Sequence, residues 1–211
     1  MQKQNVYWDV DDLILNSAEA AIDIINNKYN IPNGLPVKTI KDLKDWEMKS
    51  IYRSLTVDQL EDIFASDEFW GIVKINEKFW SIVHDECILN KYRHFFVTKG
   101  TQINLEKKYN FLSQALKGYF EEYFEYLGLL NYTCKSVVNM QGGIQIDDNV
   151  CNLSPTNARL KILVKNGRET YYNNTLNRKK VVLDNLYEVN DIIDVRDILD
   201  FNLGLETKDK L

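Results

Sequence analysis

Short apolar runs that end in polar residues alternate along the chain with stretches of helical periodicity. Residues 6–8 are apolar and lead into Asp9, Asp11 and Asp12, a pattern typical of a buried strand that presents carboxylates at its C-terminal end. Similar runs recur further along. Strands are therefore predicted at residues 6–8, 92–97, 143–146 and 158–164, with a last one at 179–183.

Between these runs, apolar residues recur every three or four positions, as they do on one face of a helix. A first helix is predicted over residues 17–29 with Ser17 as its N-cap, and another begins after Thr56. Residues 39–85 contain no strand pattern. Further helices are predicted at 104–127 and 184–199.

Strands that alternate with helices predict a parallel sheet and an α/β fold. We expect a Rossmann-like three-layer core built from residues 1–16 and 86–211. Residues 17–85, in which aromatic side chains concentrate, are expected to form a small helical cap inserted after the first strand. A chain of 211 residues is long enough for one such core with a small insertion.

Composition and net charge limit the kinds of ligand and the cellular location that we expect for the protein. The formal net charge of −5 argues against a broad grip on a long nucleic acid, although a small anionic ligand needs only a local positive site. No stretch is long enough to span a membrane. Three scattered Cys without C-x-x-C spacing indicate neither a disulfide scaffold nor a zinc ribbon, so a cytoplasmic location is expected. A homodimer is left open.

Three of the predicted strands end in residues that suit one kind of chemistry. In parallel sheets ligands bind at the carboxyl ends of the strands. The polar residues at these ends are Asp9 and Asp11, Thr98 and Lys99, and Asp147 and Asp148. Several carboxylates with neither His84 nor His94 among them form a hard oxygen site, which suits Mg²⁺ and a phosphate better than zinc.

The same residues resemble the motifs of the haloacid dehalogenase-like superfamily. The segment from Asp9 to Ser17 is similar to its first motif, D-x-D, and Thr98 is similar to its second. Residues 144–149 resemble the fourth motif. Between them, residues 134–138 are similar to the D-K-[ST]-x-x stretch of the 5′(3′)-deoxyribonucleotidases, which selects Lys135 as the lysine of the third motif.

Looser matches also point to the nucleotidase branch. Residues 44–46, 52–55 and 67–70 resemble its cap, where aromatic side chains face the nucleobase, so Trp46, Phe69 and Trp70 are predicted to contact substrate. Residues 186–189 are similar to its closing W-x-E-[IV] pattern, with Tyr in place of Trp. Two departures stand out: Asp12 replaces the usual Gly, and extra residues around 139–142 separate Lys135 from the acidic pair.

The resemblance implies a phosphomonoester hydrolase that acts through an aspartyl-phosphate. Asp9 would be the nucleophile and Asp11 the general acid and base. Thr98 would bind phosphoryl oxygens, Lys135 would offset charge, and Lys99 and Lys108 would add phosphate contacts. Mg²⁺ would be held by Asp9, the backbone carbonyl of Asp11, and Asp148, with Asp147 either a further ligand or an acceptor behind the ligands.

Three functions remain open at this point. The first is a nucleotidase acting on deoxyribonucleoside or ribonucleoside monophosphates. The second keeps the site but takes a sugar phosphate or another small phosphorylated metabolite, with the cap aromatics wholly structural. The third is a non-catalytic binding module, which the presence of Asp9, Asp11, Thr98 and Asp148 argues against.

Overall fold

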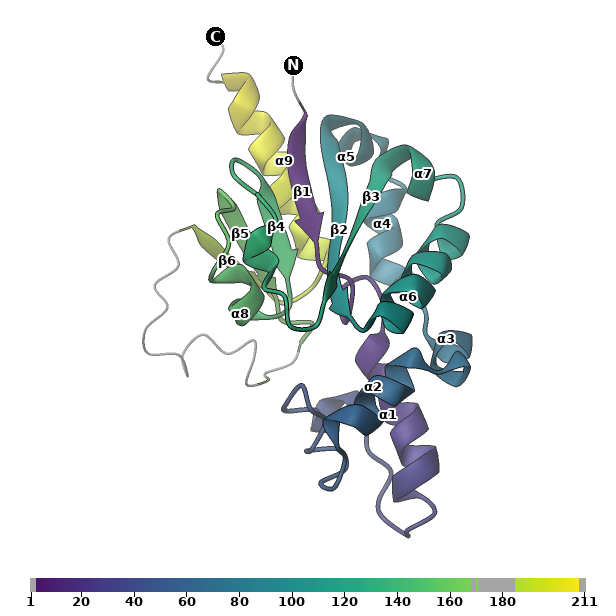
Figure 1. The fold of residues 1–211 in the computed structure, drawn as a ribbon. Helices are drawn as coiled ribbons and strands as arrows, with labels where there is room; N and C mark the ends of the chain where they lie inside the picture. The colour runs from purple at the N-terminus through teal and green to yellow at the C-terminus, as the bar shows by residue number, and fades with distance from the viewer. Residues whose placement is uncertain (1–2, 168–169, 171–184, 209–211) are drawn as a thin grey trace.

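A six-stranded parallel sheet forms the centre of the protein (Figure 1). The computed structural model describes residues 3–167, 170 and 185–208. The strands are β1 (Gln4–Trp8), β2 (Tyr92–Gly100), β3 (Phe124–Leu130), β4 (Ile144–Asp147), β5 (Leu160–Val164) and β6 (Leu186–Val189). Every neighbouring pair is parallel. The predicted Rossmann-like α/β fold class is confirmed.

The strand order β3-β2-β1-β4-β5-β6 places a topological switch point between β1 and β4. From β1 the chain proceeds outward to β2 and β3, and it then returns to add β4, β5 and β6 on the other side. Crossovers that leave in opposite directions open a crevice at the carboxyl ends of the two central strands. Trp8 pairs with Ile146, so Asp9 and Asp147 follow at the mouth of this crevice.

Helices cover both faces of the sheet and extend beyond its carboxyl edge (Figure 1). The α-helices are α1 (Ser17–Ile25), α2 (Val57–Ala65), α3 (Asp67–Ile72), α4 (Trp80–Val83), α5 (Glu86–Lys91), α6 (Gln102–Ala115), α7 (Phe120–Tyr123), α8 (Val150–Leu153) and α9 (Ile193–Lys208). Single turns of other helix types occur at η1 (Asn26–Asn30), η2 (Ile40–Asp42), η3 (Glu77–Phe79) and η4 (Lys135–Val137).

Successive residues of the strands point to opposite faces of the sheet, and the apolar ones form separate hydrophobic clusters on the two faces. One face, with Trp8, Phe96 and Phe124, packs against helices that include α4 to α7 and α9, and Phe96 stacks on Phe124 with ring centroids 4.6 Å apart. The opposite face carries a smaller cluster around Tyr7 and Phe95, whose rings stack at 5.0 Å. Burial on both faces explains why these strands read as continuous apolar runs.

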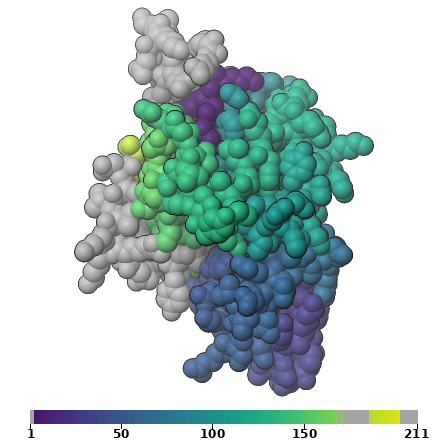
Figure 2. All heavy atoms as spheres, in the orientation of Figure 1, coloured from purple at the N-terminus to yellow at the C-terminus, as the bar shows by residue number. Residues whose placement is uncertain are grey.

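Helices α1, α2 and α3, from the segment predicted as the cap, lie together beyond the carboxyl edge of the sheet (Figures 1 and 2). The outgoing and returning chains pair where they cross: Asn16 N donates to Lys74 O at 3.0 Å and Asn76 N donates to Ile14 O at 2.7 Å. Helices α4 and α5 contact α9, on the sheet side of this crossing. The division at residues 17 and 85 stays a prediction, and these contacts favour an earlier return near Ile75.

Several predicted elements differ from those observed. The long helix predicted over 104–127 ends at Ala115, and Gly118, at φ +90°, breaks the chain direction before α7 and β3. Only Gly adopts this backbone region without cost. Residues 124–130 therefore supply the edge strand β3, which the helical reading missed.

The C-terminal third and the first helix also need correction. The strand predicted at 179–183 lies outside the described residues, and β6 at Leu186–Val189 occupies part of the predicted terminal helix, which begins only at Ile193. Ser17 is the first residue of α1 and Asn16 is its N-cap, because the Ser17 hydroxyl donates to Asp11 instead. The Thr56 cap is confirmed, with a complete capping box to Gln59.

Among the helices of the described residues, none has the length and apolar character needed to cross a bilayer.

Candidate active site

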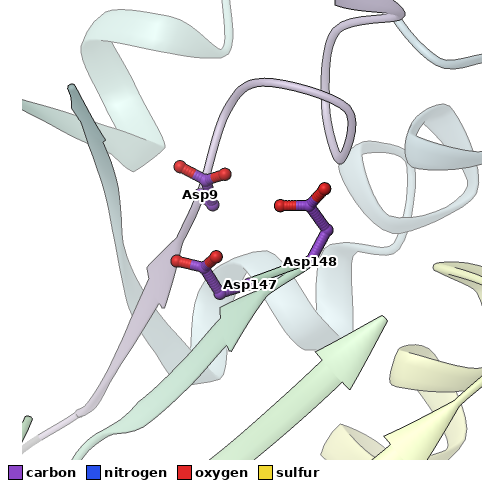
Figure 3. Close-up of side chains that lie close together, drawn as sticks. All are labelled: Asp9, Asp147 and Asp148. Atoms are coloured by element: carbon purple, nitrogen blue, oxygen red, sulfur yellow. The ribbon is translucent and has the colours of Figure 1, made fainter. Parts of the chain in front are cut away.

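Three carboxyl groups lie together where β1 and β4 end. Asp9 follows β1, Asp147 closes β4, and Asp148 comes next. All three are buried, and one carboxylate oxygen from each lies within 4.8 Å of the others. Figure 3 shows the side chains grouped around one space. Carboxylate oxygens at this spacing can hold a hard divalent cation such as Mg²⁺.

A buried lysine joins two of these acids. Lys135 lies in η4, just ahead of β4, and its Nζ donates to Asp9 Oδ1 at 2.5 Å and to Asp147 Oδ2 at 2.7 Å. Asp147 Oδ1 in turn accepts from the Asn149 backbone at 2.9 Å and from Asn152 Nδ2 at 3.1 Å. Asp147 is thus fixed by protein donors on both oxygens, which suits an acceptor that orients Lys135.

The positive charge of Lys135 alone does not neutralise the carboxyl groups of Asp9, Asp147 and Asp148. Burial raises the pKa of Asp9 to about 7, although Lys135 opposes the rise. Burial lowers the pKa of Lys135, but the Asp147 and Asp9 carboxylates outweigh it and hold that pKa above its usual value. Lys135 therefore keeps its charge while Asp9 still resists ionisation. Further positive charge would therefore stabilise the acidic cluster of Asp9, Asp147 and Asp148, as expected of a cation site.

A second buried lysine organises Asp11. Lys108 Nζ, from α6, donates to Asp11 Oδ2 at 2.5 Å, to Thr98 Oγ1 at 2.8 Å and to the Lys99 carbonyl at 3.2 Å. Ser17 Oγ donates to Asp11 Oδ1 at 2.8 Å. Both oxygens of Asp11 are therefore held by donors from different elements, and the carboxylate is oriented without being fully buried.

Asp12 occupies the turn between β1 and α1 with φ at +57°. Asp tolerates this left-handed region better than most residues do. Its Oδ1 accepts from the Ala18 backbone N–H at 2.6 Å, which satisfies a donor in the first turn of α1. The substitution of the usual Gly is thus compatible with the backbone, and it adds a helix contact.

Two adjoining cavities open between the cap and the carboxyl edge of the sheet. The larger, about 450 Å³, reaches the acidic cluster. Asp11, Asp12, Trp46, Glu61, Lys99 and Asn131 line both. Trp46, from the cap, is 52% exposed. The geometry thus joins a candidate cation site to a space with an aromatic wall.

Comparisons with known proteins bear on this arrangement. No protein-family model and no curated protein matches the sequence. Solved structures do match. A haloacid dehalogenase-like hydrolase from Streptococcus pneumoniae, SP0104, superposes with a TM-score of 0.61 at 12% identity, covering 93% of this chain and 98% of that one. The chain has the haloacid dehalogenase-like fold.

Two further matches extend over the same length. The magnesium-bound HAD-hydrolase YfnB from Bacillus subtilis has a TM-score of 0.55 at 12% identity and covers 94% of this chain and 99% of its own. A predicted phosphoglycolate phosphatase from Haemophilus somnus has a TM-score of 0.53 at 14% identity, with 94% and 98% coverage. At these identities the likeness concerns the haloacid dehalogenase-like fold alone.

Within this fold the structure brings most of the predicted site residues together. Asp9, Asp147, Asp148 and Lys135 form the acidic cluster, and Asp11, Thr98 and Lys108 form the group beside it. Lys99 and Trp46 line the cavities. Their catalytic and binding roles stay predictions.

Phe69 and Trp70 lie elsewhere. Phe69 is 1% exposed and packs edge-on against Phe64 and Trp70, with ring centroids 5.2 and 5.1 Å away. The Trp70 indole N–H donates to the Phe64 carbonyl at 2.9 Å, and neither residue lines the two cavities. In the structure both side chains pack within the cap, because helices this small need large apolar side chains to form a core, and their predicted substrate contact stays a prediction.

Sequence reasoning missed Glu61 and Asn131, which line both cavities. Asn131 follows β3, so it was overlooked together with that strand. Glu61 lies on α2, where an acidic residue is indistinguishable by sequence from one on a solvated face. A strand pattern at residues 124–130 was the signal that could have led to Asn131.

Proposed function

We propose that this protein is a Mg²⁺-dependent phosphomonoester hydrolase in which Asp9 forms an aspartyl-phosphate. The observation that carries the proposal is the cluster of Asp9, Asp147 and Asp148 carboxylates within 4.8 Å at the sheet's switch point, with Lys135 bonded to two of them. The magnesium in YfnB and the hydrolase names of the structural neighbours support it.

The donor set fits a magnesium ion. Asp9 and Asp148 would hold it together with the backbone carbonyl of Asp11, while Asp147 holds Lys135. When bound, Mg²⁺ draws negative charge from the phosphoryl group and from Asp9.

Asp9 performs the first step of the proposed reaction. Its Oδ1 accepts from Lys135, so the other carboxylate oxygen attacks phosphorus while the ester P–O bond breaks. Asp11 gives a proton to the departing oxygen. Thr98 and Lys99, at the end of β2, bind the phosphoryl oxygens, and Lys135 offsets the charge that gathers beside Asp9.

Asp11 acts again in the second step. Water attacks phosphorus and loses a proton to Asp11, the Asp9–phosphorus bond breaks, and inorganic phosphate leaves. The donors Ser17 and Lys108 orient the Asp11 carboxylate for this base role. Positioned acid–base catalysis of this kind contributes about 10²–10⁴-fold.

For the substrate we propose a nucleoside monophosphate. The half-exposed Trp46 ring lines both cavities and offers a flat surface for a base to stack on. A cavity of about 450 Å³ falls within the roughly 300–1,000 Å³ usual for small-molecule sites. A polyol or sugar phosphate is the second candidate, favoured by the acceptor groups of Glu61 and Asn131 in the same space.

Phosphate release tests this function. The purified chain is assayed on nucleoside monophosphates and sugar phosphates, with Mg²⁺ or with a chelator. We expect metal-dependent release that favours nucleoside monophosphates, and a loss of at least about 10³-fold in Asp9→Asn. Asp23→Asn, a carboxyl group on exposed α1 surface, is the matched control. Near-native turnover in Asp9→Asn would overturn the nucleophile assignment.

A further inference from the structure

The leaving-group side of the cavity carries negative charge that the proposed chemistry does not use. Glu61 and Asp45, both from the cap, line the cavity on the side of α1, and Glu61 also lines the space above the acidic cluster. Among the described residues that line these cavities, the cations are Lys99 and the ion-paired Lys135. Both belong to the core, where the transferred phosphate would bind.

Glu61 is held in place from two directions. It lies on α2, whose first turn is fixed by the capping box of Thr56 and Gln59. Across the cavity, Asn131 Nδ2 donates to Glu61 Oε1 at 2.7 Å, and Asn131 stands in the loop directly after β3. A carboxylate fixed between the cap and a strand end is a defined feature of the wall.

The groups left on this wall are mainly acceptors. The Asn131 amide donates one hydrogen bond to Glu61 Oε1. The second Glu61 oxygen and the Asn131 side-chain carbonyl oxygen are left to accept hydrogen bonds from a ligand. Asp45 uses its oxygens on the Lys49 and Ser50 backbone N–H groups, at 2.8 and 2.9 Å, and it contributes charge more than hydrogen bonding. Hydroxyl or amino groups of a ligand would match such a wall.

We infer that Glu61 and Asn131 select esters whose leaving group is uncharged or cationic and donates hydrogen bonds, and that they disfavour a second anionic group. This inference rests on the proposed function. A carboxylate or second phosphate would meet Glu61 and Asp45 in a cleft with low-dielectric walls, where like charges repel more strongly than in bulk water. Lys99 supplies one positive charge there, but it would be paired with the transferred phosphate and could not compensate a second anionic group.

The inference distinguishes this chain from a phosphoglycolate phosphatase, the name given to two structural neighbours. 2-Phosphoglycolate presents a carboxylate to the leaving-group side. 2-Hydroxyethyl phosphate and phosphoethanolamine have the same two-carbon length and end in a hydroxyl and an ammonium group. This set varies terminal charge at nearly constant size, and glycerol 3-phosphate with 3-phosphoglycerate repeats the comparison at three carbons.

The experiment measures kcat/KM for these esters with the whole chain and Mg²⁺. We expect 2-hydroxyethyl phosphate and phosphoethanolamine to exceed 2-phosphoglycolate at least tenfold, and glycerol 3-phosphate to exceed 3-phosphoglycerate similarly. Glu61→Gln keeps the size of the side chain and should reduce both ratios severalfold. Asp62→Asn removes the same charge from the neighbouring exposed position of α2 and should leave the ratios at their native values.

The outcomes distinguish the two proposals. Hydrolysis with equal or better use of the carboxylate esters would overturn the charge selection and leave the hydrolase function standing. Ratios that do not respond to Glu61→Gln, or that respond equally to Asp62→Asn, would remove Glu61 from the role. If neither these esters nor nucleoside monophosphates released phosphate, the hydrolase function would be overturned and this selectivity with it.

Discussion

The core side and the cap side of the cavity are built differently. On the core side, two buried lysines each bond to at least one carboxylate, and every contact joins a helix or helical turn to the end of a strand or the loop after it. On the cap side, Trp46 is half exposed, and Glu61 is joined to the core by the hydrogen bond that it accepts from Asn131.

This contrast agrees with what the proposed function requires of each side. Bond making at phosphorus needs reacting groups held within fractions of an ångström, and buried ion pairs on strand ends supply that rigidity. Recognition of a leaving group needs only suitable charge and shape. We therefore expect changes on the core side to affect stability and every substrate alike, and changes on the cap side to alter the choice among substrates.

The largest expected effect comes from Lys135→Met. Removing one partner from a buried ion pair costs about 3–5 kcal/mol, because the remaining charges are left uncompensated. Asp9 and Asp147 would face each other without the ammonium. We expect this loss of unfolding free energy in chelator, and a fall of at least about 10²-fold in kcat on all esters. Chemical denaturation and phosphate release measure the two quantities.

Two controls sharpen the result. Lys28→Met breaks the exposed pair with Glu68 and should cost about 1 kcal/mol or less. Added Mg²⁺ should restore more stability to Lys135→Met than to the native chain, since a divalent cation would replace part of the missing charge. A Lys135→Met protein as stable as the native one in chelator would contradict the role of Lys135 in compensating the buried carboxylates.

The same division governs what the sequence could predict. The strand-end acids are visible because an apolar run followed by Asp is legible in a single chain, and β1 with β4 then brings Asp9 and Asp147 together. The buried Lys108 was named as a phosphate contact. Its ammonium proves to be bonded to Asp11, Thr98 and a carbonyl, a pattern that depends on packing across three elements.

The residues on the cap side of the cavity were harder to predict from the sequence. Phe69 and Trp46 are both aromatic residues of the predicted cap, yet Phe69 is 1% exposed and Trp46 is 52% exposed. Burial in a small helical insertion depends on how its segments pack against one another. Residues 124–127 were included in the predicted helix because the spacing of Leu and Tyr there fits either period, and strand β3 with the Asn131 that follows it was missed. Local pattern cannot resolve such cases without tertiary contacts.

An intermediate effect is expected from β2, the strand that carries Thr98. His94 is buried on it: Nδ1 accepts from the Trp8 indole N–H at 3.1 Å, and Nε2 faces the Ile88 carbonyl at 3.3 Å. Burial lowers the pKa of His94 to about 4, below the value of an exposed histidine. At this site the unfolded chain therefore binds a proton that the folded chain excludes, and the contribution of His94 to stability falls as the pH drops from about 6.5 toward 4.

The His94 shift by itself lowers the unfolding free energy by about 2 kcal/mol at pH 5 relative to pH 7.5, while the raised pKa of Asp9 acts in the opposite direction over the same range, so the His94 contribution is the difference between the native chain and His94→Gln. Urea denaturation at several pH values measures it. His84→Gln, which alters the other histidine of the chain, should keep the native pH dependence, and His94→Gln should become more stable at pH 5 relative to pH 7.5 than the native chain by about this amount. An unchanged slope in His94→Gln would show that other groups control stability in this range.

The smallest expected effect belongs to the cap and is the most specific. Trp46→Ala removes the aromatic wall without touching a buried ion pair, so stability and the hydrolysis of glycerol 3-phosphate should change little. Stacking of a base on an aromatic ring contributes about 1–3 kcal/mol, so KM for a nucleoside monophosphate should rise about tenfold. Tyr132→Ala is the matched control, since Tyr132 is 86% exposed and does not line the two cavities. An equal rise in KM for both substrate classes would mean that Trp46 shapes the cap instead of contacting a base, and the polyol phosphate would then become the better substrate assignment.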